Sequence, residues 1–162
     1  MPPGTATERP LLPVDGKTAR RSHDRARGLG ALHSVSVYAA QLGITLAQVA
    51  TMEKSNEFTA FPEVLKLVNL AGAIVTIDAM GTQTEIAEQI VDGEGDYLLA
   101  LKGNHPTLHQ AVIEIVNIQL DTDIPAAQRL VTTETGHGRK EQRIYMQLSA
   151  LETLPGFDQW KE

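Results

Sequence analysis

The sequence predicts an α/β fold with a mixed sheet, and three observations carry that prediction. Hydrophobic residues alternate with a period of two up to about residue 52, and they take helical spacing after residue 58. Two short apolar runs, 73–80 and 96–101, follow that change and leave room for a helix between them. With 162 residues, of which 42% are hydrophobic, the chain is long enough to bury one core.

The first part of the chain is predicted to form three antiparallel strands. Alternation of apolar and polar side chains is clearest in the second strand, where His33, Val35 and Val37 alternate with Ser34 and Ser36. The predicted segments are a disordered lead at 1–9, a strand at 10–16, a polar and basic loop at 18–30, and strands at 32–40 and 44–52 joined by a turn at 41–43.

Helices and strands are predicted to alternate after residue 58. Thr59 is predicted to cap the first helix, and Thr82 with Glu85 forms a capping box for the second. The segments are a helix from 59 toward Gly72, a strand reaching Asp78, a helix from 82 to Gly93, a strand at 96–101, a helix opened by Asn104 and Pro106, and β structure at 130–149 split by Gly136-His137-Gly138.

The summed order is β-β-β-α-β-α-β-α followed by a β-rich insertion near the C-terminus, which is the ribonuclease-H-like arrangement. A partial domain of this kind is predicted over 10–120, and the insertion over 121–162. That fold places one carboxylate on the first strand and another on the fourth, where Asp15 and Asp78 occur. Two such aspartates can hold Mg²⁺ or Mn²⁺ for phosphoryl transfer. Taken alone, Asp15 favours a plain strand end before a turn, and Asp78 favours a cap of the turn that follows it; taken together on these two strands, they favour a metal pair.

Charge and composition limit the function classes. The chain has no cysteine, so disulfides and thiolate metal sites are excluded, and it has no apolar run long enough to predict a membrane span. A net charge of −6 argues against general nucleic-acid binding, although residues 1–30 hold six basic residues against three acidic ones. Polar side chains at the predicted junctions are candidates for DNA contact, or alternatively helix caps and solvated charges: Lys17, Arg20, Arg21, Lys54, Asn56, Lys102, Asn104, His137, Arg139 and Arg143.

Several motifs together resemble the bacterial insertion-sequence transposases of the H-repeat-associated type. They are Val14-Asp15-Gly16-Lys17, Glu53-Lys54-Ser55-Asn56-Glu57, Thr76-Ile77-Asp78-Ala79-Met80-Gly81, Asp96 to Asn104, and Gly136-His137-Gly138-Arg139. The resemblance implies a DDE transposase, which cleaves DNA at the ends of an insertion sequence and joins the 3′-hydroxyl to target DNA. It implies Asp15 and Asp78 as catalytic acids that bind Mg²⁺ or Mn²⁺. The implied partners are double-stranded DNA (terminal repeats and target) and a second copy or full-length transposase, in the bacterial cytoplasm and at the nucleoid, with no membrane.

The third acid of this family lies in a downstream helix with a pattern like Arg-x-His-Trp-x-Ile-Glu-Asn, and no such pattern occurs in this sequence. We therefore expect a transposase fragment, truncated at both ends and inactive. An active enzyme would need Glu141, within the β-rich insertion, as the third acid. A non-catalytic DNA-binding remnant or inhibitor of full-length transposase is the alternative. A small-molecule α/β domain is disfavoured, because no glycine-rich phosphate loop is present.

Overall fold

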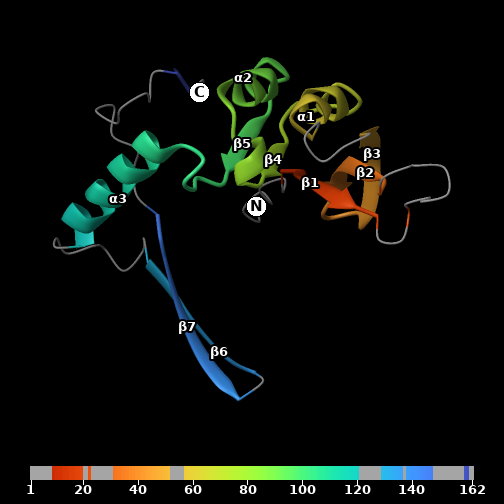
Figure 1. The fold of residues 1–162 in the computed structure, drawn as a ribbon. Coiled ribbons are helices and arrows are strands. Elements are labelled where there is room, and N and C mark those ends of the chain that lie inside the picture. Colours follow the sequence, from red (N-terminus) through yellow and green to blue (C-terminus); the bar gives the residue numbers. More distant parts are fainter. Residues whose placement is uncertain are drawn as a thin grey trace, which may run out of the picture. The chain divides into compact units, whose positions relative to one another are not determined.

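The computed structural model describes residues 9–19, 22, 31–51, 57–120, 129–136, 138–147 and 159–160. Two compact units divide the chain, 1–104 with 159–162 and 105–158, and each is described by itself. Along the described chain the order is β-β-β-α-β-α-β-α-β-β, with a short 3₁₀ turn after the fourth strand (Figure 1).

A five-stranded sheet in the order β3-β2-β1-β4-β5 forms the first unit. β1 pairs antiparallel with β2, which pairs antiparallel with β3, whereas β1–β4 and β4–β5 are parallel. This mixed sheet confirms the predicted α/β class and is consistent with a ribonuclease-H-like domain. The strands are β1 Leu11–Thr18, β2 His33–Ala39, β3 Ile44–Thr51, β4 Ile74–Ile77 and β5 Asp96–Leu99.

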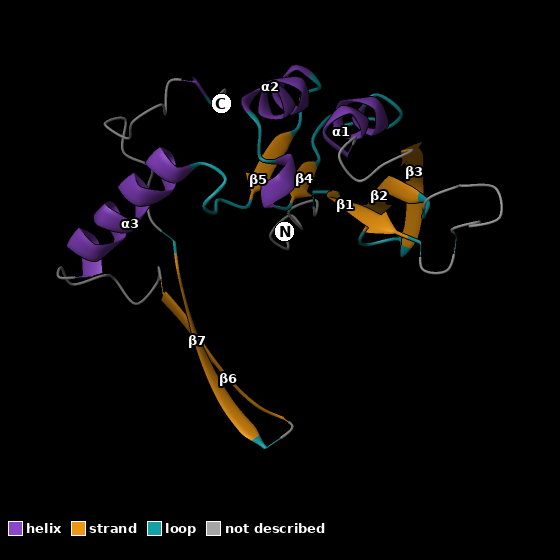
Figure 2. Cartoon of the chain, viewed as in Figure 1, coloured by secondary structure: helices purple, strands orange, loops and turns teal. Residues whose placement is uncertain are grey.

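Two helices, α1 (Glu57–Leu65) and α2 (Thr84–Asp92), lie on the same side of this sheet (Figure 2). Phe61 of α1 and Ile90 of α2 are fully buried against the sheet valines Val35 and Val75. Because side chains alternate along a strand, the residues next to each of these valines on its own strand point to the other side of the sheet. We call that side the Asp15 face.

The starts of both helices differ from the prediction. α1 begins at Glu57, so Thr59 is not its cap and Pro62 lies in the second turn. Proline there removes one helical hydrogen bond, and its carbonyl accepts a hydrogen bond from the Gln89 side chain at 3.0 Å. α2 begins at Thr84, where the N-cap makes no side-chain hydrogen bond, so the predicted capping box of Thr82 is wrong.

Contacts between distant segments fix the start of the parallel strands. Arg9 hydrogen-bonds the carbonyls of Gly72 and Ala73 and forms an ion pair with Asp96 at the start of β5. The Gln41 side chain accepts from the Leu11 backbone and donates to the Arg9 carbonyl, each at 3.0 Å. Arg9 therefore belongs to the folded unit although it falls in the predicted lead, whose residues 1–8 lie outside the described residues.

The second unit contains α3 (Pro106–Leu120) and a hairpin of β6 (Arg129–Gly136) and β7 (Arg139–Met146). The hairpin has its own register, from Arg129 opposite Met146 to Gly136 opposite Arg139. Gly138 in the turn has a positive φ of 75°, which glycine adopts without strain. Within the described part of the chain, no helix is long and apolar enough to cross a membrane.

Candidate functional site

Asp15 and Asp78 lie next to each other because of the register between β1 and β4. The last parallel pair joins Val14 to Ile77, and each aspartate is the next residue along its own segment. Val14 and Ile77 are buried beneath the helices, so both aspartates project from the Asp15 face, where both are exposed. Neighbouring strands are about 4.8 Å apart, a separation at which two carboxylates can share one cation.

Asp15 lies within β1 rather than at its end, because β1 continues to Thr18 through antiparallel pairing with β2. The Lys17 ammonium lies 3.3 Å from Asp15 Oδ2 on the same face. Both side chains are more than half exposed, so this ion pair contributes less than about 1 kcal/mol and leaves the carboxylate accessible to a cation.

Asp78 follows β4 directly and caps the 3₁₀ turn η3 (Ala79–Gly81). Its Oδ1 accepts a hydrogen bond from the Met80 backbone at 3.1 Å. The capping interaction is the alternative that the sequence had left open for this residue. It holds the carboxylate in a fixed orientation, and a carboxylate has further lone pairs with which to bind a cation.

Asp78 lies at the start of a turn. The side chains of Thr82 and Asn104 connect this turn by hydrogen bonds to the segment that follows β5. The buried Thr82 hydroxyl lies 2.8 Å from the Ala100 carbonyl and 3.2 Å from the Asp78 carbonyl. The Asn104 side chain donates to the Ala79 carbonyl at 2.6 Å. We name these two residues the turn brace. Sequence reasoning missed it because a Thr three residues before a Glu has the pattern of a capping box.

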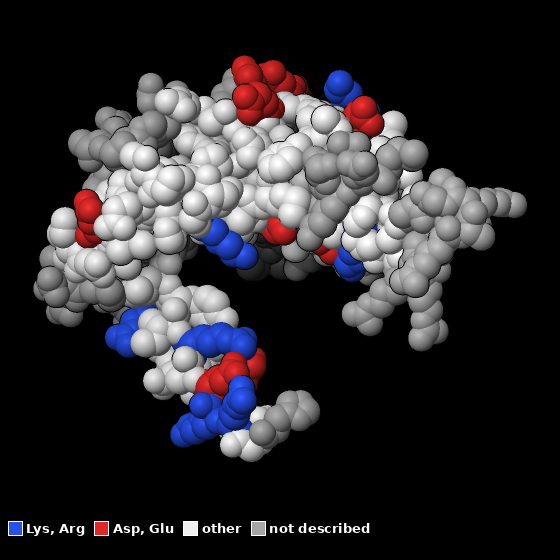
Figure 3. All heavy atoms as spheres, in the orientation of Figure 1, with Lys and Arg blue, Asp and Glu red and all other residues white. Residues whose placement is uncertain are grey.

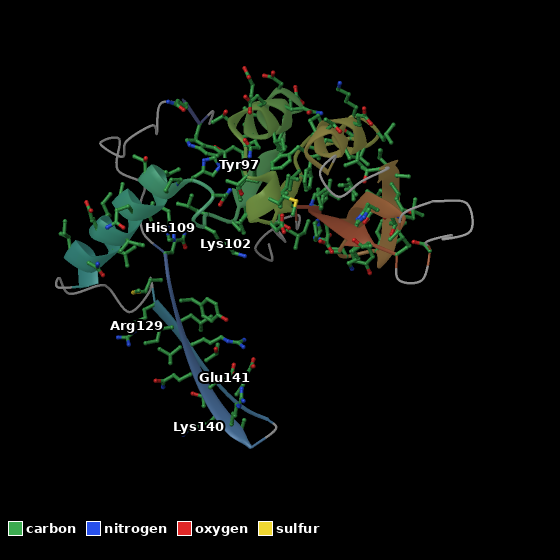
Figure 4. The ribbon with its side chains drawn as sticks, viewed as in Figure 1. Tyr97, Lys102, His109, Arg129, Lys140 and Glu141 are labelled. Atoms are coloured by element: carbon green, nitrogen blue, oxygen red, sulfur yellow. The ribbon has the colours of Figure 1, made fainter. Side chains whose placement is uncertain are left out.

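Predicted DNA contacts fall into three groups. Lys17 and Lys102 are exposed in the first unit, Lys102 after β5 and on the same segment as Asn104 (Figure 4). Arg139 and Arg143 lie on β7 in the second unit. The remaining predicted contacts, Arg20, Arg21, Lys54, Asn56 and His137, lie outside the described residues.

Glu141, the candidate third acid, lies in the middle of β7 and is paired across the hairpin with Glu134. Arg143 Nη2 donates to Glu141 at 2.8 Å, and Arg143 Nη1 lies 3.6 Å from Glu134. The carboxylate is therefore already compensated by a guanidinium on its own strand.

A metal fits the first unit through two carboxylates. Among the described residues, no group of three or more acidic or histidine side chains is placed to hold a metal ion. Asp15 and Asp78 are hard oxygen ligands of the kind that Mg²⁺ and Mn²⁺ prefer, and Mg²⁺ is commonly held by one or two carboxylates together with substrate phosphate. The donor set thus fits a weakly held divalent ion that a phosphate would help to bind.

A family model and several relatives match this sequence. The family model described as "Transposase DDE domain" matches residues 5–153. The chain is 43% identical to "Putative transposase YncI" of Escherichia coli strain K12 over 86% of the chain and 56% of that protein. It is 36% identical to "H repeat-associated putative transposase YhhI" of the same strain over 97% of the chain and 42% of that protein.

A further relative, "Putative transposase YncI" of Escherichia coli O157:H7, is 40% identical over 96% of the chain and 40% of its own length. The chain therefore spans between 40% and 56% of the length of these relatives. No solved structure matches it.

Proposed function

The chain belongs to the transposase DDE domain family, and from this premise we propose that it acts in DNA transposition with Asp15 and Asp78 as the first two metal-binding acids. One observation carries the proposal: two exposed aspartates follow the last parallel pair of β1 and β4 and project from the same face. Carboxylates at the carboxyl ends of parallel strands line the crevice in which open α/β sheets bind ligands.

A divalent ion, when bound, favours in-line displacement at phosphorus by activating the attacking oxygen and stabilising the leaving one. The chain's own residues prepare the site for it. Asp15 and Asp78 supply the oxygen ligands, and the turn brace keeps Asp78 in place relative to β5. Lys17 lies beside Asp15, and Lys102 follows β5; both are exposed, and in this proposal both bind the phosphate backbone of double-stranded DNA.

We propose that this chain by itself binds metal weakly and joins DNA strands little, because its described residues offer two acids at the site and Glu141 lies on strand β7 of the hairpin rather than on a helix packed on the sheet. A missing ligand usually lowers metal affinity and rate, since the geometry of the site depends on every ligand. The second candidate is a DNA-binding inhibitor that assembles with full-length transposase. The basic side chains of hairpin β6–β7 favour that function, because an inhibitor that binds DNA needs no catalytic site.

Metal affinity tests the proposed acids directly. We would titrate Mn²⁺ into the unmodified chain and into Asp15→Asn and Asp78→Asn, and follow free Mn²⁺ by electron paramagnetic resonance. Each substitution should weaken binding by about tenfold or more, because it removes a charged oxygen ligand. Glu63→Gln on the exposed side of α1 is the matched control and should leave the affinity unchanged. Unchanged Mn²⁺ affinity in both aspartate variants would contradict the assignment of Asp15 and Asp78 as metal ligands.

Strand joining separates the enzyme from the inhibitor. A duplex that carries the element's terminal repeats would be incubated with the chain and Mn²⁺, and joined product would be measured on a gel. We expect little product. Robust joining that Glu141→Gln abolishes as fully as Asp78→Asn would instead establish Glu141 as the third acid.

A further inference from the structure

The two faces of hairpin β6–β7 differ in chemistry. Residues paired across an antiparallel ladder project to the same side, so the register assigns every side chain to a face. One face combines the even-numbered residues of β6 with the odd-numbered residues of β7, and it carries both acids, Glu134 and Glu141. We call it the acidic face, and the opposite one the acid-free face.

Charges on the acidic face compensate one another. Glu134 and Glu141 stand directly opposite, which is unfavourable for like charges, and Arg143 lies within 3.6 Å of both carboxylates. A shallow depression at the tip of this face is lined by both glutamates and Arg139. Arg143 is therefore paired with both acids of this face, and Arg139 lines the same depression as these acids.

The basic residues of the acid-free face share that face with no acidic residue of the hairpin strands. It combines residues 129, 131, 133 and 135 of β6 with 140, 142, 144 and 146 of β7, and none of these is acidic. Arg129 lies at one end and Lys140 near the tip, with Gln142 and threonines between them (Figure 4). Val131 and Ile144 form an exposed apolar pair near the base of the hairpin, exposed by 45% and 48%.

This face fits the major groove of DNA. A two-stranded ribbon is narrow enough to enter that groove, where Gln can pair with adenine, and Thr and apolar side chains can contact base edges and thymine methyl groups. Lys140 and Arg129 are spaced along the ribbon to contact phosphates. Figure 3 shows basic side chains along the hairpin around a small acidic cluster, whereas over α2, where Glu85, Glu88 and Asp92 lie, it shows acidic side chains. An isolated two-stranded hairpin is also marginally stable and gains from such a partner.

We propose that the acid-free face of hairpin β6–β7 docks in the major groove of double-stranded DNA, with Lys140 on a phosphate and Gln142 at a base edge. The inference rests on the proposed function, because it takes duplex DNA as the partner. It replaces the sequence-based prediction that Arg139 and Arg143 contact DNA, because both lie on the acidic face with Glu134 and Glu141, and it assigns Arg143 the task of neutralising these two acids.

Arg139 and Lys140 are adjacent in β7 but project from opposite faces of the hairpin, so they provide a matched test. Lys140→Gln and Arg139→Gln remove one charge each from neighbouring, exposed positions of β7. Affinity of the full chain for a fluorescein-labelled duplex of mixed sequence, about 30 base pairs long, would be measured by anisotropy across several salt concentrations. Lys140→Gln should weaken binding about five- to tenfold and lower the magnitude of the salt slope by about one. Arg139→Gln should change the affinity less than twofold.

Each outcome decides a separate point. If the unmodified chain binds no duplex, the DNA partner of the proposed function fails and this inference fails with it. If it binds and Arg139→Gln costs as much as Lys140→Gln, or more, the face assignment alone is overturned. If Lys140→Gln leaves DNA affinity intact while Ile144→Lys turns a dimer into a monomer in sedimentation, the face is a contact between copies of this chain, and the proposal is overturned.

Base contact by Gln142 has its own test. A pool of duplexes with a randomised centre would be selected with the full chain and with Gln142→Ala, and the bound DNA sequenced. We expect an adenine-containing preference that Gln142→Ala removes, while total affinity falls only a few fold. Identical enrichment by both chains would overturn the base contact.

Discussion

The sheet unit and the hairpin are stabilised by different interactions. In the sheet unit, Val35, Val64 and Val75 are completely buried, and distant segments are joined by the side chains of Arg9, Thr82 and others. In the hairpin, Leu130 and Tyr145 stay 61% and 50% exposed, and cross-strand pairs hold the structure. The sheet therefore holds the backbone of both aspartates in one register, whereas the hairpin leaves large apolar side chains exposed.

The largest expected effect is on the buried core. Phe61→Ala removes a ring that is 1% exposed and should lower the free energy of unfolding by about 3 to 5 kcal/mol. Ile144→Ala on the hairpin, where the side chain is 48% exposed, should cost less than about 0.5 kcal/mol. Urea denaturation followed by circular dichroism measures both. Equal destabilisation would show that the hairpin is packed as tightly as the sheet.

A smaller effect is expected where the core meets the candidate site. An added Cβ at Gly81 would overlap Ile77 Cγ2 and lie 3.1 Å from the Phe61 ring. Gly81→Ala should therefore cost about 1 to 3 kcal/mol and weaken Mn²⁺ binding, because the turn after Asp78 must shift. Gly103→Ala, whose Cβ would meet no atom within 4 Å, is the control and should change neither quantity.

The turn brace predicts an effect on metal binding beyond its effect on stability. Thr82→Val keeps the shape but leaves the Ala100 carbonyl without that hydroxyl, at a cost of about 1 to 2 kcal/mol. Mn²⁺ affinity should fall several fold, and Thr82→Ser should restore it. Val64→Ala serves as control, because it destabilises the core without touching the Asp78 turn. A Thr82→Val chain with normal metal affinity would show that the hydroxyl is only structural.

The smallest expected effect lies in the hairpin. Arg143→Gln leaves Glu134 opposite Glu141 without their shared cation, so the hairpin should lose less than about 1 kcal/mol. Because the repulsion is between exposed charges, 0.5 M NaCl should recover most of the loss. Amide hydrogen exchange of β6 and β7 measures it. A loss that salt does not recover would mean that Arg143 acts by packing rather than by charge.

Local pattern predicted most of the strands and helices. Strands at 10–16, 32–40 and 44–52 were predicted, and strands are observed at Leu11–Thr18, His33–Ala39 and Ile44–Thr51. The predicted starts of α1 and α2 were wrong. Cap signals depend on one or two residues, and at Thr82 a tertiary hydrogen bond to Ala100 replaced the local one. The roles of Asp15, Asp78 and the DNA contacts stay predictions.

By itself the sequence determined the periodicity of its segments and the positions of the two aspartates along the chain. It also carried the motifs whose resemblance to a family implies that these aspartates bind metal. Only the tertiary structure decided that Asp15 and Asp78 follow one parallel pair, that Thr82 and Asn104 brace the turn between β4 and α2, and that Arg143 lies between two glutamates. The physical reason is range. Periodicity reflects which side of each segment is buried, whereas register and hydrogen bonds between segments depend on how distant parts of the chain pack together.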